Sequence, residues 1–325
     1  MYDITALGEL LIDFTPCGIS EAGMKIFEQN PGGAPANVLV AAENFGAKTA
    51  FIGKVGKDMH GEFLKEILEK YNIETKGLIM DERVFTTLAF VSLNEKGERT
   101  FSFARKPGAD TCLTKEEVNL DLIKESKIFH FGSLSLTDSP SKEALLYALE
   151  KSKEMNKIIS YDPNYRPLLW RNEETAIKEM RAVVKYADIM KISDEETELL
   201  TGYKEPEKAA LKLIEQGVSL VFVTLGSEGS FLRTKDFQIK VKSKKCNVID
   251  TTGAGDAFWG AILYKLSTRK DNILQLTENE GQEYLEFANI AAGICVEKRG
   301  AIPAMASLEE VLKRSFEAKN KKIDK

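Results

Sequence analysis

The pattern of apolar and polar residues predicts short buried strands that alternate with amphipathic helices. Buried parallel strands are expected where apolar and β-branched residues run together, at 4–13, 49–55, 127–133, 157–162, 187–192 and 220–225. Helices are expected where apolar positions repeat with helical spacing, at 34–45, 59–70, 139–155 and 281–297. This alternation predicts a doubly wound α/β sheet.

Two segments depart from the alternation. Residues 84–93 and 99–104 are rich in β-branched and aromatic residues and flank a turn at 94–98, which predicts a hairpin. Residues 14–30 lack helical spacing. We expect a small antiparallel sheet from these segments, inserted at about 14–30 and 84–106 into a single domain that spans all 325 residues. Because a small sheet has an apolar face to hide, two copies are expected to pair through it as a homodimer.

The composition is that of a globular protein. Hydrophobic residues make up 43% of the 325 residues, which is enough for a large core, and the formal net charge is −5. No uncharged apolar stretch approaches the roughly 20 residues that span a bilayer, and the first residues do not resemble a leader. Four widely spaced cysteines and two histidines argue against a zinc site and for a reducing compartment. We therefore expect a cytoplasmic protein that binds neither nucleic acid nor membrane.

The stretch at 250–260 carries the clearest chemistry. Residues 238–249 read as a strand, and the helical spacing of apolar residues resumes at Ala257, so a glycine loop joins a strand to a helix. Gly253 and Gly255 let the backbone bend and approach a ligand, and the first amides of the helix form a seat for an anion such as phosphate. Asp256 stands beside this seat, where it could take the proton of an attacking hydroxyl. A capping aspartate on a glycine-rich turn is the structural alternative.

Two motifs together resemble a known family. Asp250-Thr-Thr-Gly-Ala-Gly-Asp256 is similar to the C-terminal signature of the PfkB/ribokinase family of carbohydrate kinases, and Pro31-Gly-Gly-Ala-Pro-Ala-Asn37 is similar to its N-terminal signature. The motifs occur in the family's order and lie far apart, so the resemblance covers nearly the whole chain. It implies a ribokinase-like three-layer αβα sandwich with a small antiparallel β lid, and ATP with Mg²⁺ as cosubstrates.

The resemblance also implies where the sugar binds. Asp13, at the end of the first predicted strand, would accept from sugar hydroxyls. Residues 105–110 resemble the Arg-x-Pro-x-Ala-Asp segment of fructokinases, and residues 162–170 resemble a segment shared with 2-keto-3-deoxygluconate kinases. The residues expected at the sugar or the transferred phosphoryl group are Asp13, Gly32, Gly33, Asn37, Phe101, Arg105, Asp162 and Arg166.

A third group of residues is expected at the nucleotide and its cations. Ser193 stands where the family's Asn-x-x-Glu motif has asparagine, and with Glu196 it also reads as a helix capping box. Glu196 would act on Mg²⁺ through water, and backbone carbonyls of Asp250 and Thr252 would hold a monovalent cation such as K⁺. The nucleotide residues implied are Asn164, Ser193, Thr224, Gly226, Gly229, Gly253, Gly255 and Asn289.

These features predict an ATP-dependent sugar kinase that resembles fructokinases, with fructose and ATP as partners. Asp256 would be the base, and residues Gly253, Ala254 and Gly255 would bind the phosphoryl group. The adjacent helix N-terminus is expected to keep Asp256 ionised and weakly basic. Three alternatives remain: a 2-keto-3-deoxygluconate kinase, another sugar kinase of this family, or a sugar-binding regulator without activity.

Overall fold

The computed structural model describes residues 1–93 and 99–323 of the chain. Nine strands form the main sheet in the order β13-β12-β11-β10-β9-β8-β1-β4-β5. The seven strands from β11 to β5 are parallel, and β12 and β13 add an antiparallel edge. The strands are β1 (Tyr2–Leu7), β4 (Thr49–Gly56), β5 (Glu74–Asp81), β8 (Ser126–Gly132), β9 (Ile158–Asp162), β10 (Ile189–Ser193), β11 (Leu220–Thr224), β12 (Ser230–Arg233) and β13 (Gln238–Val241).

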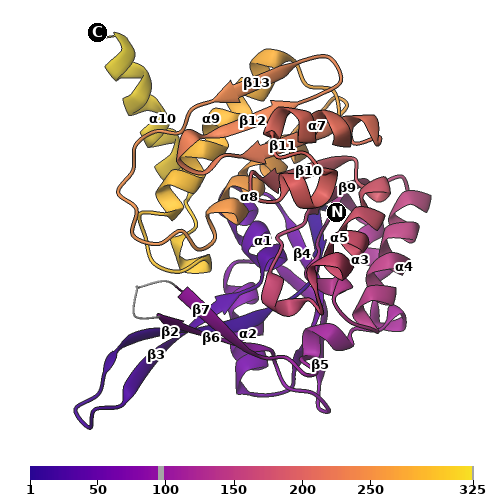
Figure 1. Cartoon of the computed structure of the whole chain (residues 1–325), viewed down its shortest axis with the longest axis vertical. Helices are drawn as coiled ribbons and strands as arrows, with labels where there is room; N and C mark the ends of the chain where they lie inside the picture. Colours follow the sequence, from indigo (N-terminus) through magenta and orange to yellow (C-terminus); the bar gives the residue numbers. More distant parts are fainter. Residues whose placement is uncertain (94–98, 324–325) are drawn as a thin grey trace.

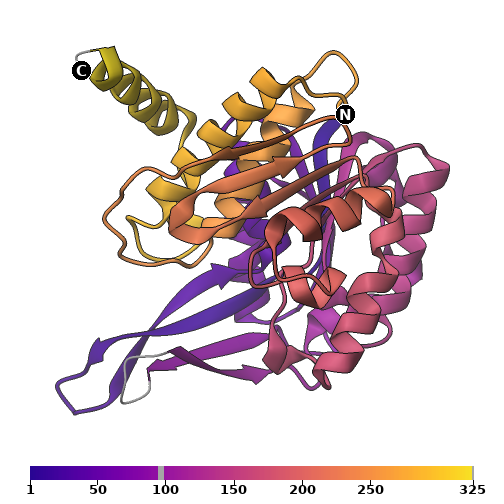
Figure 2. The same ribbon diagram turned by 45° about the horizontal axis from the view of Figure 1, so that its top comes forward.

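Helices cover both faces of this sheet, so the molecule has three layers (Figures 1 and 2). Side chains that alternate along a strand enter two separate cores: on β11, Phe222 joins one cluster, whereas Val221 and Val223 join the other. The first core lies under α1 (Ala34–Asn44), α2 (Met59–Lys70), α8 (Ala254–Ser267), α9 (Glu278–Cys295) and α10 (Leu308–Ile323). The second lies under α3 (Leu120–Lys124), α4 (Ser141–Glu154), α5 (Glu173–Ala182), α6 (Thr197–Thr201) and α7 (Pro206–Glu215).

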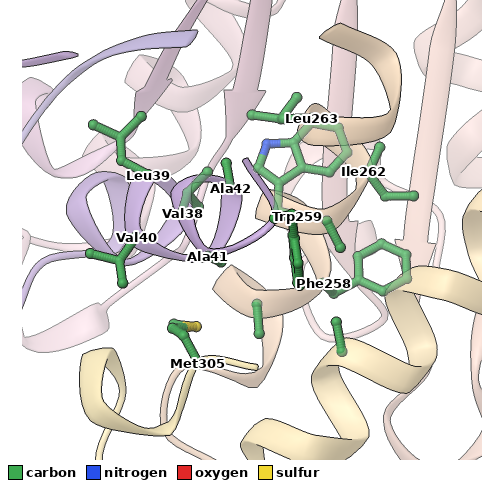
Figure 3. Close-up of a cluster of buried hydrophobic side chains, with 14 of the residues drawn as sticks. Val38, Leu39, Val40, Ala41, Ala42, Phe258, Trp259, Ile262, Leu263 and Met305 are labelled. Carbon is green, nitrogen blue, oxygen red and sulfur yellow. The ribbon is translucent and has the colours of Figure 1, made fainter. Parts of the chain in front are cut away.

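The helix pair α1 and α8 holds the site described below. Apolar side chains of both helices interlock, among them Val38, Leu39, Phe258 and Trp259 (Figure 3). A β-carbon on Gly260 would lie 2.6 Å from the Val38 carbonyl oxygen, so the two backbones are closely apposed there. Among the described residues, no helix is long and apolar enough to cross a membrane.

Four further strands form a second sheet that extends away from the main body (Figures 1 and 2). Their order is β3-β2-β6-β7, and we call this sheet the lid: β2 (Leu11–Ile19), β3 (Lys25–Gly32), β6 (Leu88–Leu93) and β7 (Arg99–Ala104). Because β2 pairs with β6 in parallel, the expectation of a purely antiparallel lid is wrong. The expected turn at 94–98 lies outside the described residues.

Two expected strands have different limits. The apolar run at 4–13 is not one strand: β1 ends at Leu7 in the main sheet, and β2 begins at Leu11 in the lid. The break is not visible in the sequence, because Leu10, Leu11 and Ile12 are buried like the residues of β1 and so continue the apolar run. The strand expected at 238–249 ends at Val241, and an irregular segment leads from there to the glycine loop.

Candidate active site

A cavity of about 800 Å³ lies between the lid and the ends of the main strands. Its wall includes Asp13 and Phe101 from the lid, Lys191 from β10, and Asp256 from the first turn of α8. The cavity thus lies at the carboxyl ends of the strands, which is where open α/β sheets bind their ligands.

The N-terminus of α8 opens onto this cavity. Gly253 precedes the helix with φ 78°, and a β-carbon there would lie 2.9 Å from Ala301 Cα, so both the left-handed backbone and the close approach require glycine. No side chain caps the helix. The Ala254 amide donates to the Thr251 carbonyl at 3.2 Å, whereas the Gly255 and Asp256 amides have no partner within the helix. Residues 253–256 line the cavity. An anion is therefore favoured at this place.

Asp256 is held by two amide side chains from distant parts of the chain. Its Oδ2 accepts a hydrogen bond of 2.8 Å from Asn37 Nδ2 on α1, and its Oδ1 accepts one of 3.2 Å from Asn164 Nδ2 after β9. The side chain is buried, which raises the pKa of Asp256, while Asn37, Lys191 and Arg166 act to lower it. The expectation of a weakly basic carboxylate is therefore wrong, because burial outweighs the helix and the neighbouring donors.

A buried ion pair lies next to this helix terminus, and the sequence reasoning missed its cation. Lys191 Nζ donates to both oxygens of Asp162, at 3.1 and 2.9 Å. Burial alone would lower the pKa of Lys191, but Asp162, Glu196 and Asp256 raise it, so the ammonium is charged. The signal available in the sequence was a lysine inside an otherwise apolar strand, Ile189–Ser193.

Glu196 ties two loops together below the cavity. Its carboxylate accepts from the backbone amides of Tyr165 and Ser193, each at 2.8 Å. The bond to Ser193 is half of the expected capping box, but Ser193 ends β10 and α6 begins only at Thr197, so the serine does not cap a helix. The tie fixes the segment that carries Asn164, whose φ is 48°.

Glu9 is a second residue that the sequence reasoning missed. It lies where the chain passes from the main sheet to the lid, and its Oε1 accepts from the Ala34 amide at 2.8 Å, at the start of α1. Gly33 precedes that helix with φ 119°, and a β-carbon there would lie 2.3 Å from the Glu9 carbonyl oxygen. Burial raises the pKa of Glu9 to about 7. Glu9 thus positions the Gly32–Gly33 turn.

Most of the expected site residues line the cavity. From the sugar and catalytic groups these are Asp13, Gly33, Asn37, Phe101, Arg166, Gly253, Ala254, Gly255 and Asp256. From the nucleotide and cation groups they are Asn164, Ser193, Glu196, Thr224, Gly226, Gly229, Asp250, Thr252 and Asn289. Residues more than two hundred positions apart thus share one wall, as the two motifs required.

Three expected residues do not line the cavity: Gly32, Arg105 and Asp162. Arg105 is buried at the end of the lid, where it forms an ion pair with Asp110 and donates to Thr137 Oγ1 and the Leu134 carbonyl. Its donors are used within the protein, so the structure does not support its expected contact with a sugar. Asp162 is turned to Lys191, and a β-carbon on Gly32 would lie 2.4 Å from Asp13 Oδ2, so Gly32 makes room for that carboxylate.

Asp250 organises the loop in front of α8. Its Oδ1 accepts from the amide and hydroxyl of Thr252, at 2.9 and 2.7 Å, and its Oδ2 accepts from the Gly300 amide at 3.2 Å. On the nucleotide side, Asn289 Nδ2 donates to the Val241 carbonyl at 3.2 Å. No cluster of three or more histidine, cysteine, aspartate or glutamate side chains that could hold a metal occurs in the part of the chain that is described.

The chain is similar to carbohydrate kinases over nearly its whole length. The model of the pfkB family carbohydrate kinases matches residues 1–307. Fructokinase-2 of Oryza sativa subsp. japonica is 43% identical over 308 residues, which cover 94% of this chain and 91% of the relative.

Solved structures agree with this similarity. A fructokinase from Xylella fastidiosa with bound ATP has a TM-score of 0.90 and 31% identity, over 98% of this chain and 99% of that one. A double mutant of the fructokinase from Vibrio cholerae O395, in a form that binds fructose, ADP and a potassium ion, has a TM-score of 0.87 and 31% identity, over 96% and 98% of the two chains. These similarities confirm the expected ribokinase-like three-layer sandwich with a small lid.

Proposed function

The chain belongs to the pfkB family of carbohydrate kinases, and we propose that it transfers the γ-phosphoryl group of ATP to the 6-hydroxyl of fructose. The observation that carries this proposal is the position of Asp256. It lies on the cavity wall, at an uncapped helix N-terminus and within hydrogen-bond distance of Asn37 and Asn164. The names of the similar full-length proteins point to fructose.

In the proposed reaction, the 6-hydroxyl oxygen of the sugar forms a bond to the γ-phosphorus of ATP. The bond from that phosphorus to the bridging oxygen of ADP breaks, and ADP leaves with the electron pair. Asp256 accepts the hydroxyl proton, for which its raised pKa suits it. The Gly255 and Asp256 amides at the start of α8 would offset negative charge on the phosphoryl oxygens without having to reorient.

The two substrates would enter from opposite ends of the cavity. Asp13, Gly33, Asn37 and Phe101 lie at the lid end and suit the sugar, since a carboxylate and an amide bind hydroxyls and an aromatic ring covers an apolar ring face. ATP would lie over the ends of β10 and β11 and against α9, along Asn164, Ser193, Thr224, Gly226, Gly229 and Asn289. Arg166 would face the transferred phosphoryl group.

The carboxylates of this site suit Mg²⁺ that arrives with ATP. Mg²⁺ keeps several waters and takes one or two carboxylates together with substrate phosphates, so it needs no cluster of protein ligands. Glu196 lines the cavity, but both of its oxygens already accept backbone hydrogen bonds, which favours an indirect contact through water. When bound, the ion would neutralise phosphate charge. The carbonyls of Asp250 and Thr252, which the Asp250 side chain orders, would hold K⁺.

The lid supports a proposed homodimer. Apolar side chains are exposed on both faces of the lid, since the successive β3 residues Ile26, 43% exposed, and Phe27, 38% exposed, point to opposite sides. Packing of two lids face to face would cover those on the facing side.

The substrate is tested by ATP consumption with Mg²⁺ and K⁺ against fructose, 2-keto-3-deoxygluconate, ribose and adenosine in parallel. The expected result is a kcat/KM for fructose at least about tenfold above the others. A substrate that leaves a buried polar group of the site without a hydrogen bond reacts with a much lower kcat/KM than one that satisfies it. If the protein prefers the keto acid, the proposed phosphoryl transfer stands and the proposed substrate changes from fructose to 2-keto-3-deoxygluconate. Saturable sugar binding without turnover would indicate the regulator instead.

A further inference from the structure

The Lys191 ammonium lies beside the N-terminus of α8, the end of a helix where a cation is least expected. A β-carbon built on Gly255, the second residue of α8, would lie 3.0 Å from Lys191 Nζ. The ammonium is therefore next to the uncapped, partly positive start of the helix, where anions are stabilised and cations are not. Such a placement is stable only if negative charge lies close to both groups.

Asp162 supplies part of that negative charge, on one side only. The Lys191 and Asp162 side chains are 7% and 2% exposed, so the pair is shielded from solvent. An ammonium has three donors, and its hydrogen bonds within the described structure go to the two Asp162 oxygens. Lys191 lines the cavity, whereas Asp162 does not. The carboxylate thus lies behind the lysine, and the remaining donor is on the cavity side.

The same contact explains Gly255. Its backbone is not in the left-handed region, so conformation alone does not require glycine there. The nearest atoms to a β-carbon at this position would be Nζ and Cε of Lys191, at 3.0 and 3.6 Å. Gly255 therefore leaves room for the ammonium between the helix start and the cavity.

We propose that Lys191 binds the γ-phosphoryl group of ATP during its transfer, and that Asp162 positions it for this contact. The inference rests on the proposed function and extends it. As the sugar oxygen bonds to the γ-phosphorus and the bridging bond to ADP breaks, negative charge remains on the non-bridging oxygens. Lys191 offsets that charge together with the α8 amides, while the hydroxyl proton goes to Asp256. The lysine itself forms and breaks no covalent bond.

A purely structural role is the competing explanation, because breaking a buried ion pair leaves one charge unpaired and destabilises a protein. Three variants separate the two roles: Lys191→Met, Asp162→Asn and the double variant. Lys191→Met removes the cation and leaves Asp162 unpaired. The double variant removes both charges, so it restores the charge balance of the core without restoring a cation in the cavity.

We expect the double variant to recover most of the melting temperature that Lys191→Met loses, and yet to keep its low kcat, about 100-fold below the unsubstituted protein. Asp162→Asn retains the cation and is expected to lose less turnover than Lys191→Met. If the double variant regained both stability and turnover, Lys191 would be a structural residue and the inference would fail.

A binding measurement tests the same contact without turnover. Isothermal titration calorimetry with Mg²⁺ compares ADP with a non-hydrolysable imido analogue of ATP, which differs by the γ-phosphate. Lys191→Met is expected to weaken the binding of the analogue by about 10- to 100-fold and to leave the affinity for ADP nearly unchanged. Equal losses of affinity for ADP and for the analogue would overturn the inference. Failure of the unsubstituted protein to phosphorylate fructose would count against the proposed function instead, and this nucleotide comparison would still report on Lys191.

Discussion

At the scale of single residues, the site depends on charged groups that are buried together. Asp256, Asp162 and Lys191 are all buried and lie at one end of α8. Burial raises the pKa of Asp256, and Lys191 acts in the opposite direction. Burial thus makes Asp256 a stronger base than an exposed aspartate, while the neighbouring donors and cations act against that effect.

The role of Asp256 is tested by Asp256→Asn, which keeps the shape of the side chain. Turnover is expected to fall by roughly 100- to 10,000-fold, because no group remains to accept the proton. Nucleotide affinity is expected to persist in calorimetry. A carboxyl group whose pKa folding raises stabilises the folded state less as pH rises through that pKa, so the neutral asparagine is expected not to lower the melting temperature at pH 7.

The pH dependence provides an internal control for this variant. The kcat of the unsubstituted protein is expected to decline as pH falls through the raised pKa of Asp256, and the residual rate of Asp256→Asn is expected to lack that decline. An unchanged kcat in the variant would remove Asp256 as the base.

At the scale of elements, the site requires α1 and α8 to be closely packed. Asn37 and Asp256 are contributed by these two helices, and their hydrogen bond of 2.8 Å depends on the distance between them. Gly260 permits the approach, since a β-carbon there would lie 2.6 Å from Ala41 Cβ and from the Val38 carbonyl oxygen. Figure 3 shows the neighbouring apolar side chains of both helices, among them Val38 and Trp259.

Gly260→Ala is therefore expected to destabilise the protein by about 1–3 kcal/mol, because the added methyl group forces the helices apart. Gly293→Ala on α9 is the matched control, since the nearest atom to its β-carbon would be 3.9 Å away. The control is expected to be neutral or more stable by up to about 1 kcal/mol, as alanine favours a helix. Urea unfolding measures both, and equal effects would contradict the packing argument.

At the scale of the whole molecule, the lid lies outside the layered body. It extends from the body as a separate sheet (Figure 2), and its two halves come from residues 11–32 and 88–104. Arg105 and Asp110 anchor it through a buried ion pair. Such a sheet is stabilised further if its exposed apolar side chains are covered by another copy.

If two lids pair, Ile26→Asp is expected to shift the protein from dimer to monomer, because the substitution would bury a charge in the interface. Light scattering coupled to size-exclusion chromatography measures the mass. Tyr203→Asp is the control, as Tyr203 is 44% exposed outside the lid. A monomeric unsubstituted protein at high micromolar concentration would exclude the proposed pairing.

The sequence by itself determined the elements and the main motifs. Apolar spacing located β4, β8, β9, β10 and β11 and the helices α1, α2, α4 and α9 to within a few residues, because that spacing directly reflects which side faces a core. The glycines and Asp256 were recognisable because the amides of a helix start and a nearby carboxylate are local features.

Only the tertiary structure decided which groups meet. The apolar run at 4–13 does not record that the chain changes sheets at 8–10, since both parts are buried. Arg105 is an ordinary cation in the sequence, and only its burial against Asp110 removes it from the cavity. The pairing of Lys191 with Asp162, and the burial that raises the pKa of Asp256, likewise depend on contacts between distant residues, which local spacing does not encode.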